Sequence, residues 1–254
     1  QSKALNMIKD KENLEIIQDK RYEEIIANSP AISMEKFNST KILFSSIPMY
    51  VESAKQSQSG MTRASSSSYY WVWGWDNIVT AMEMYKGNDY KGQKDIISFI
   101  LSHRWIDGSV PHRYDREYNV MQTMHFCAED SLFIILAYQY CIDAEDYAYL
   151  KEIYADLKQI WMGLVNKTDA KGYIKGPGLY PDNLKALGRN ENSRTAMETG
   201  TFYTACRIME ITASILNDIP TKELAFDIFT KIEDNYIKDF FNEEYGTLID
   251  SIYD

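Results

Sequence analysis

Helical periodicity dominates this sequence and divides it into pairs of helices. Apolar residues recur at helical spacing in segments that we expect to be helices: 4–27, 34–54, 76–85, 90–103, 126–141, 146–165, 195–216 and 221–241. In the later pairs the first helix is apolar on nearly all sides, as in the run SLFIILAY at 131–138, and the second is amphipathic. A helix that is apolar all round is buried. The sequence therefore predicts an all-α fold in which inner helices alternate with outer ones, in two layers.

The lengths of the connections alternate as well. A few residues join the two helices of a pair, whereas connections of about 20 to 30 residues, at 104–125 and 166–194, join one pair to the next. In an up-and-down array the long connections emerge at one end, and loops beyond about 12–15 residues are usually functional. These loops carry aromatic, acidic and cationic side chains: Trp105, Asp107, His112, Arg113, Tyr173, Tyr180, Asp182, Arg189 and Arg194. We expect a functional site at that end.

Composition excludes several classes of protein. The net charge is −10 and no basic patch is present, which sets nucleic-acid binding aside. No apolar stretch reaches about 18 residues, so we expect no membrane span. The three cysteines, Cys127, Cys141 and Cys206, lie in apolar helical runs without a CxxC or Cys/His cluster. His112 and His125 lack a partner at metal-ligand spacing, so we interpret them as loop hydrogen-bonders and expect neither a metal nor a cofactor.

An α-solenoid that binds peptides or proteins is the alternative architecture. Solenoid repeats have a fixed period of about 34 to 47 residues and matching motifs. Here the helix pairs recur after about 50 and then about 70 residues and share no motif. Long loops rich in ligand-type side chains are also unusual in solenoids. The spacing therefore argues against that class.

The aromatic segment YYWVWGWD at 69–76 allows two interpretations. One is a rigid hydrophobic plug at the end of the array. The other is a sugar site, because sugars have apolar CH faces ringed by hydroxyls and need aromatic platforms beside a hydrogen-bonding carboxylate. Trp73, Trp75 and Asp76 would supply both parts. Asp76 can also cap the helix that follows, and the two roles are compatible.

Acidic residues mark two further positions at this end. Glu129 and Asp130 begin an inner helix, where negative charge favours the helix dipole; a ligand-binding role is the functional interpretation, and Arg113 can pair with either carboxylate. Asp182 stands in the Pro/Gly-rich segment GPGLYPDN at 176–183. A carboxyl against rings such as Tyr180 loses solvation, which raises its pKa and suits it to general acid catalysis. The alternative for Asp182 is an Asx-turn.

Four segments, taken in order, resemble the catalytic domain of (α/α)6-barrel glycoside hydrolases, and most nearly the amylo-α-1,6-glucosidase and processing α-glucosidase group. They are YWVWGWD at 70–76, DGSVPHR at 107–113, AEDSLF at 128–133, and YPDN at 180–183 followed by METGTFY at 197–203. The resemblance runs from about Tyr69 to the end of the chain. The last pair departs from the family pattern, because Pro181 precedes Asp182 where the family has methionine before its aspartate.

The resemblance implies a toroid of helical hairpins of the (α/α)6-barrel type, with Asp182 as the general acid. It also implies a sugar site formed by Trp73, Trp75, Asp76, Trp105, Arg113, Glu129 and Tyr180. Inversion of configuration is implied, with the general base beyond residue 254. Within this chain Glu198 is the carboxylate that would bind sugar or stand in as the base. A closed barrel needs six hairpins and we count about four, so we expect an incomplete barrel.

These observations predict that residues 1–254 form a single domain that hydrolyses an α-linked glucan or a related oligosaccharide. Glycan binding without catalysis is one alternative. A different (α/α) enzyme, such as an unsaturated uronyl hydrolase or a polysaccharide lyase, is another. The chain begins at Gln1 rather than at methionine, so we expect a periplasmic or secreted protein after removal of a signal, in preference to a cytoplasmic one.

Overall fold

A computed structural model describes residues 20, 61–62, 71–84, 88–115, 119–121, 127–178 and 188–253. Within these residues it contains six helices. They are α3 (Gly74–Met84), α4 (Tyr90–Ser102), α5 (Cys127–Asp143), α6 (Tyr147–Val165), α8 (Ala196–Ile215) and α9 (Ile219–Phe240). Apart from residue 20, the helices expected at 4–27 and 34–54 lie outside the described residues and stay predictions.

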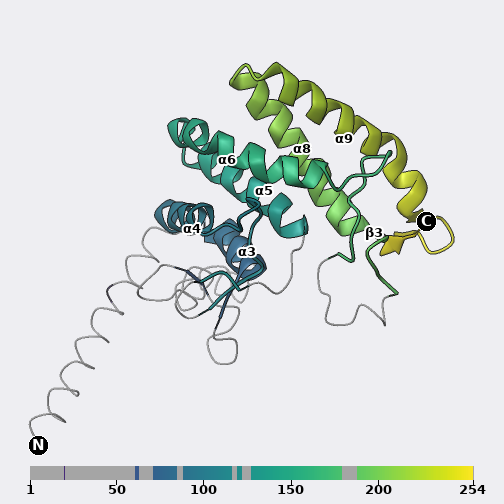
Figure 1. The fold of residues 1–254 in the computed structure, drawn as a ribbon, viewed down its shortest axis with the longest axis horizontal. Coiled ribbons are helices and arrows are strands. Elements are labelled where there is room, and N and C mark those ends of the chain that lie inside the picture. The colour runs from purple at the N-terminus through teal and green to yellow at the C-terminus, as the bar shows by residue number, and fades with distance from the viewer. Residues whose placement is uncertain are drawn as a thin grey trace, which may run out of the picture.

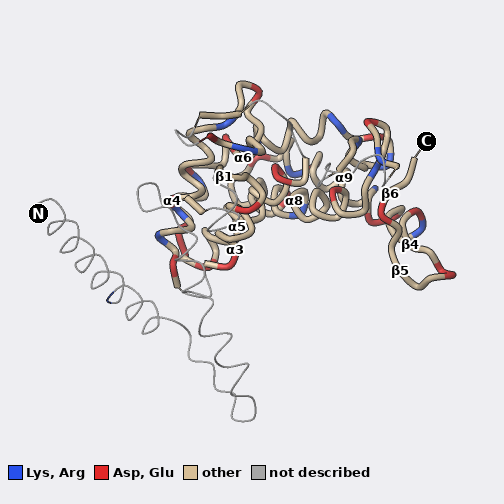
Figure 2. The backbone as a smooth tube through the Cα atoms, turned by 90° about the horizontal axis from the view of Figure 1, so that it is seen from below, with Lys and Arg blue, Asp and Glu red and all other residues tan. Residues whose placement is uncertain are grey.

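Strands are confined to three short antiparallel pairs in the described part of the chain. They are β1 (Val72–Trp73) with β2 (Arg113–Tyr114), β3 (Arg194–Thr195) with β6 (Ser251–Ile252), and β4 (Phe241–Asn242) with β5 (Thr247–Leu248). The β4–β5 hairpin extends away from the helices (Figure 2). The prediction of an all-α fold is confirmed, and the segment after residue 241, expected to be irregular, contains three of the short strands.

The helices form hairpins that lie next to one another in chain order, from α3 and α4 to α8 and α9 (Figure 1). α3 packs against α5, and α5 packs against α8, while α4, α6 and α9 each pack against the helix that precedes them. α5 is buried on several sides, with Phe133, Leu136 and Ala137 in the core. α6 buries one face, through residues that include Leu157 and Trp161. The two predicted layers therefore form because a helix that is apolar on most sides is buried, whereas a helix with one apolar face lies outside it.

Two helices start two residues before their expected positions. α3 begins at Gly74, so Asp76 lies in its first turn and is not the cap. α9 begins at Ile219 instead of Thr221, because the Asp218 side chain accepts a hydrogen bond from the Thr221 backbone amide. Pro220 fits at this place because the first turn of a helix does not need its backbone N–H groups.

The turns inside the hairpins share one conformation. In each, a residue with positive φ precedes the aspartate that caps the outer helix: Asn88 (55°) before Asp89, Glu145 (53°) before Asp146, and Asn217 (58°) before Asp218. Two of these caps also join neighbouring outer helices. Lys94 of α4 lies 2.7 Å from the Asp146 carboxylate, and Lys158 of α6 lies 2.6 Å from that of Asp218. The turn end of the array is thus held by capping and by ion pairs.

The long connections meet at the opposite end, where the inner helices begin. The Val110 amide donates to Asp130 Oδ1 at 2.7 Å, which ties the loop after α4 to the start of α5. The Gly176 amide donates to the Ser193 carbonyl, and the Ala196 amide donates to the Asp250 carbonyl. The described parts of these loops therefore lie at one end, as the alternation of loop lengths predicted.

The three cysteines are part of the core. All are buried and none forms a disulfide. Burial is the main cause that raises the pKa of each thiol to about 12, so these side chains stay protonated at neutral pH. They pack as small apolar groups, and Cys206 also accepts a hydrogen bond from the Trp161 indole at 3.3 Å. Of the helices that the structure describes, none is long and apolar enough to cross a membrane.

Candidate functional site

The strand pair β1–β2 brings an arginine onto the aromatic segment. Its register places Trp73 opposite Arg113. The guanidinium carbon of Arg113 lies 4.4 Å from the ring centre of Trp71 and 5.2 Å from that of Trp73. Both distances are typical of cation–π contacts. The expected pairing of Arg113 with Glu129 or Asp130 is therefore wrong, because the strand register directs its guanidinium to the rings.

His112 takes the place next to Glu129 that we had considered for Arg113. The Nδ1 atom of His112 lies 2.6 Å from Glu129 Oε1. The imidazole ring also meets the Trp73 ring edge to face, with 5.1 Å between the ring centres. The same Glu129 oxygen accepts a hydrogen bond from the Trp75 backbone amide at 3.2 Å. One carboxylate therefore joins the WGWD segment to the loop after α4.

The backbone approach at Gly74 is close enough to require glycine. The Gly74 amide donates to the His112 carbonyl at 2.8 Å. A Cβ atom at this position would fall 2.4 Å from the carbonyl oxygen of Pro111. Because a backbone oxygen cannot move aside as a flexible side chain can, the glycine permits this crossing of the two segments.

Asp76 is partly buried in the first turn of α3. Burial is the largest influence on the pKa of its carboxyl and raises it above the usual value. A backbone hydrogen bond and the charge of His112 act in the opposite direction. Asp76 directly follows Trp75, whose backbone amide donates to Glu129, so it lies next to this carboxylate and Trp73. We use the name aromatic–carboxylate cluster for Trp73, Asp76, His112, Arg113 and Glu129.

Trp105 lies elsewhere in the same loop. Its amide donates to the Ser109 carbonyl, and its carbonyl accepts from the Gly108 amide, so it forms a tight turn. That turn packs over α6, where a Cβ at Gly108 would meet the side chain of Gln159 at 2.7 Å. No described contact joins Trp105 to the aromatic–carboxylate cluster. Its place in a sugar site stays a prediction.

Glu198 lies at the start of α8, as expected. Thr195 caps that helix, and its hydroxyl accepts a hydrogen bond from the Glu198 amide at 3.1 Å. The Glu198 residue is only 2% exposed. α8 packs against α5, and the charge of Glu198 helps to raise the pKa of Cys127, the first residue of α5, after the larger effect of burial. The starts of two inner helices thus bring buried carboxylates, Glu129 and Glu198, to the same end of the array.

The proposed acid Asp182 and Tyr180 lie outside the described residues. The residues on either side of that segment are described. A Cβ at Gly178 would fall 2.5 Å from the Thr195 side chain, and one at Gly188 would fall 3.3 Å from the Tyr253 hydroxyl. Both flanks therefore lie at the loop end of the array, beside the start of α8.

His112 and Asp130 make contacts in the structure that the sequence pattern did not predict. His112 was interpreted only as a loop hydrogen-bonder, and its contacts link Trp73 to Glu129. Asp130 was considered together with Glu129, and its side chain instead holds the loop amide of Val110. Both residues lie in segments that resemble the glycosidase family, DGSVPHR and AEDSLF, and this was the feature of the sequence that could have identified them. Among the described residues there is no group of three or more His, Cys, Asp or Glu side chains placed to hold a metal ion.

Comparison with known proteins reveals similarity of fold and not of sequence. The sequence matches no protein-family model and no curated protein. Among solved structures, a GH78 family rhamnosidase of Bacillus sp. GL1 superposes with a TM-score of 0.66 at 11% identity, over 88% of this chain and 23% of the rhamnosidase. A rhamnosidase from Klebsiella oxytoca with rhamnose bound gives 0.64 at 13% identity, over 87% and 42% of the two chains.

A sugar epimerase from a ruminal bacterium is also similar, with a TM-score of 0.58 at 11% identity over 94% of this chain and 64% of the epimerase. The chain thus spans between about a quarter and two thirds of the lengths of these three proteins. Two rhamnosidases and an epimerase do not single out the amylo-α-1,6-glucosidase group. They do establish the fold class: the chain has the helical-hairpin architecture of the glycosidase (α/α)-barrel type.

Proposed function

We propose that this chain is part of a glycoside hydrolase and that the aromatic–carboxylate cluster binds the sugar. The observation that carries the proposal is the arrangement of Trp73, Arg113 and Asp76 around the His112–Glu129 pair at the loop end. Sugar sites combine flat apolar surfaces with fixed hydrogen-bonding groups. The similarity of fold to rhamnosidases supports the same conclusion at the level of architecture.

The residues of the cluster divide into those that would contact sugar and those that hold them. Trp73, Trp75 and Asp76 are partly exposed, so their side chains are accessible to a ligand. Arg113 is partly exposed as well, although its Nε atom is buried, so any contact with a sugar would come from the outer part of the guanidinium. Glu129 is fully buried. In our proposal it acts through His112 and the Trp75 amide.

Asp182 remains our candidate for the general acid. Glycoside hydrolysis needs two carboxyl groups, about 6.5–9.5 Å apart for inversion and about 5–5.5 Å for retention. Asp182 comes four positions after Gly178 in the chain. Gly178, the last described residue before that segment, lies beside Thr195 at the loop end. We propose inversion, as the family resemblance implies.

Glu198 is less suited to the role of general base. A base must deprotonate a water molecule, and the 2% exposure of Glu198 leaves no open path to it in this structure. We propose that it orients groups at the start of α8. A second candidate function is glycan binding without hydrolysis, because neither Glu129 nor Glu198 is open enough to water to serve as the base within these residues.

A panel of sugars separates these functions. The protein would be incubated with maltose, isomaltose, nigerose, trehalose, an α-mannoside and an α-rhamnoside, and released monosaccharide and epimerised sugar would be measured by chromatography. Binding would be measured in parallel by calorimetry. Release from a glucoside supports hydrolysis of an α-linked glucan, and release from the rhamnoside alone contradicts that specificity.

Variants locate the site within the same panel. Trp73→Ala should abolish binding and release together. Tyr147→Ala removes an exposed ring at the opposite end of the array and should leave both unchanged. Binding of sugars without release would favour glycan binding without hydrolysis. Epimerisation without release would show that the protein catalyses a different reaction on sugars. No binding of any sugar would overturn the proposal.

A further inference from the structure

The antiparallel pair β1–β2 has a buried face and an outer face. Side chains alternate between the two faces of a strand, and residues paired across two strands share a face. Val72 and Tyr114 are paired and almost fully buried, so they form the inner face. Trp73 and its partner Arg113 therefore lie on the outer face. Trp71, two residues before Trp73, falls on the same side, and its ring contacts that of Trp73.

Trp71 forms the outer end of a series of rings in contact. The ring centres of Trp71 and Trp73 are 6.2 Å apart. The Trp73 ring also meets that of His112, at 5.1 Å between centres. His112 in turn lies against the buried carboxylate of Glu129. The series thus runs from a buried carboxylate inside the aromatic–carboxylate cluster to a tryptophan at the surface.

Trp71 is held in place and is still open to solvent. The guanidinium carbon of Arg113 lies 4.4 Å from the centre of the Trp71 ring, so the guanidinium covers part of that ring. The residue remains 38% exposed. A large aromatic side chain at the surface offers apolar area that a ligand can cover. Because Trp73 and Arg113 already orient the ring, covering it costs little further side-chain entropy.

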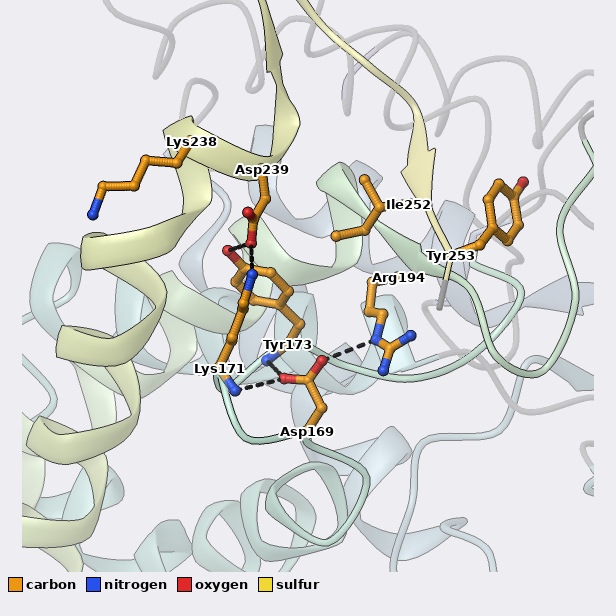
Figure 3. A pocket seen from close by; sticks show the side chains of 8 residues that line it. All are labelled: Asp169, Lys171, Tyr173, Arg194, Lys238, Asp239, Ile252 and Tyr253. Carbon is orange, nitrogen blue, oxygen red and sulfur yellow. Dashed lines mark hydrogen bonds and ion pairs between the residues drawn. The ribbon is translucent and has the colours of Figure 1, made fainter.

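A pocket of about 390 Å³ lies elsewhere, between the ends of α6 and α9 and the strand β6 (Figure 3). Ion pairs hold its polar side chains. Arg194 Nε lies 2.9 Å from Asp169 Oδ2, and Lys171 Nζ lies 2.6 Å from Asp239 Oδ2. None of the residues that line it belongs to the aromatic–carboxylate cluster. Trp71, by contrast, is in direct contact with that cluster, so we place a further sugar unit there.

We infer that Trp71 forms an outer subsite, which contacts the second sugar unit of an oligosaccharide whose first unit contacts Trp73. Two neighbouring sugar units are joined through a single oxygen atom, so two aromatic rings in contact can each face one of them. The aromatic–carboxylate cluster binds the first unit, and Trp71 adds affinity for a longer chain. This inference rests on the proposed function, because it assumes that Trp73 contacts sugar.

Sugars that differ by one unit test the outer subsite. The affinities of the full chain for glucose, mannose and rhamnose would be compared by calorimetry with those for maltose, mannobiose and rutinose. Trp71→Ala should weaken disaccharide binding about 5-fold more than monosaccharide binding, as expected for loss of an aromatic contact. Trp71→Phe keeps a ring and should recover most of that affinity. Phe226→Ala is the matched control, because it removes another exposed ring in edge contact with a neighbour, on α9.

Nuclear magnetic resonance of the parent protein gives a second readout that decides the question even if Trp71→Ala impairs folding. The indole N–H signals of Trp71 and Trp73 would be followed while each sugar is added. Both signals should shift with a disaccharide. The Trp73 signal alone should shift with the corresponding monosaccharide, because one sugar unit does not reach the outer ring.

The remaining outcomes separate this inference from the proposed function. Equal losses of monosaccharide and disaccharide affinity in Trp71→Ala would show that Trp71 only supports Trp73, and would overturn the outer subsite. Unchanged disaccharide affinity in Trp71→Ala, or a disaccharide that shifts the Trp73 signal alone, would overturn it and leave the proposed function standing. A Trp71 shift that persists with a disaccharide in Trp73→Ala would support the outer ring and count against the proposed function. No binding of any of these sugars would overturn both.

Discussion

His112 Nδ1 lies 2.6 Å from Glu129 Oε1, and the same oxygen accepts the Trp75 amide at 3.2 Å. Glu129 is fully buried, and hydrogen bonds are stronger in such surroundings than in water. The loop after α4 and the aromatic segment before α3 are therefore held together through one side chain of α5. The shape of the candidate sugar site depends on this relationship.

Replacing Glu129 with glutamine should weaken that link. The amide side chain keeps an acceptor of similar size but loses the charge, so we expect Glu129→Gln to lower the free energy of unfolding by about 1–3 kcal/mol. Binding of sugar should weaken as well. Urea unfolding measures the first effect and calorimetry the second. Glu152→Gln, on the exposed side of α6, should stay within about 0.5 kcal/mol of the parent; equal effects of the two substitutions would contradict the assigned role.

Two glycines provide a matched test of the close backbone approach. Gly74→Ala would place a Cβ 2.4 Å from the Pro111 oxygen, so we expect a loss of about 1–3 kcal/mol in unfolding free energy. Gly163→Ala adds a Cβ on α6 with nothing within 4 Å. It should stabilise the protein by about 0.5–1 kcal/mol, because alanine favours helix. Denaturant unfolding of both variants should show changes in unfolding free energy of opposite sign. An unchanged unfolding free energy for Gly74→Ala would show that the two segments can separate without cost.

Asp182→Asn tests the proposed acid in any form of the protein that releases sugar. An amide cannot supply the proton, so kcat should fall by about 10²- to 10⁴-fold. Affinity should change little, because asparagine keeps the size of the side chain. Steady-state kinetics and calorimetry measure the two quantities. Asp234→Asn, at an exposed position of α9, serves as the control. Normal turnover by Asp182→Asn would remove the assignment.

Glu145→Asn should stabilise the turn before α6. Glu145 has a φ of 53°, and the equivalent positions in the other two described turns are asparagines. Asparagine adopts this left-handed conformation at lower cost than glutamate, so we expect a gain of about 0.5–1 kcal/mol. Thermal unfolding measures the gain. Asn217→Ala is the reverse experiment and should destabilise the protein. An unchanged unfolding temperature for both variants would show that the positive φ at these turns causes no strain.

The caps Asp146 and Asp218 should contribute to acid sensitivity. Hydrogen bonds from Lys94 and Lys158 are the largest causes that hold the pKa values of these two carboxyls below their usual range. A carboxyl whose pKa is lower in the folded state stabilises that state above the unfolded value of about 3.9. This stabilisation is lost as the pH falls through the folded-state value.

Asp218→Asn should therefore be less stable than the parent at pH 7, and the difference should narrow below about pH 4. Urea unfolding between pH 7 and pH 2 measures it. Asp143→Asn removes an exposed carboxyl at the end of α5 and serves as the control substitution. A gap between Asp218→Asn and the parent that stays constant in acid would contradict the expected contribution.

Much of the architecture could be predicted because helical periodicity is a local property of the chain. The apolar run 131–138 and the one-sided pattern of 146–165 predicted an inner and an outer helix, and α5 and α6 are arranged in that way. The alternation of short and long connections predicted the loop end. The start of α9 was misplaced because a capping aspartate at 218 outweighed the weak helix signal of Pro220.

The contacts inside the site depended on the tertiary structure. Composition and spacing placed Arg113, His112 and Glu129 at one end, but they did not show which side chain meets the carboxylate. The register of β1 and β2 decided it by directing Arg113 to the tryptophans and His112 to Glu129. Periodicity records which face of a helix is buried, whereas contacts between distant segments arise only when the hairpins pack against one another.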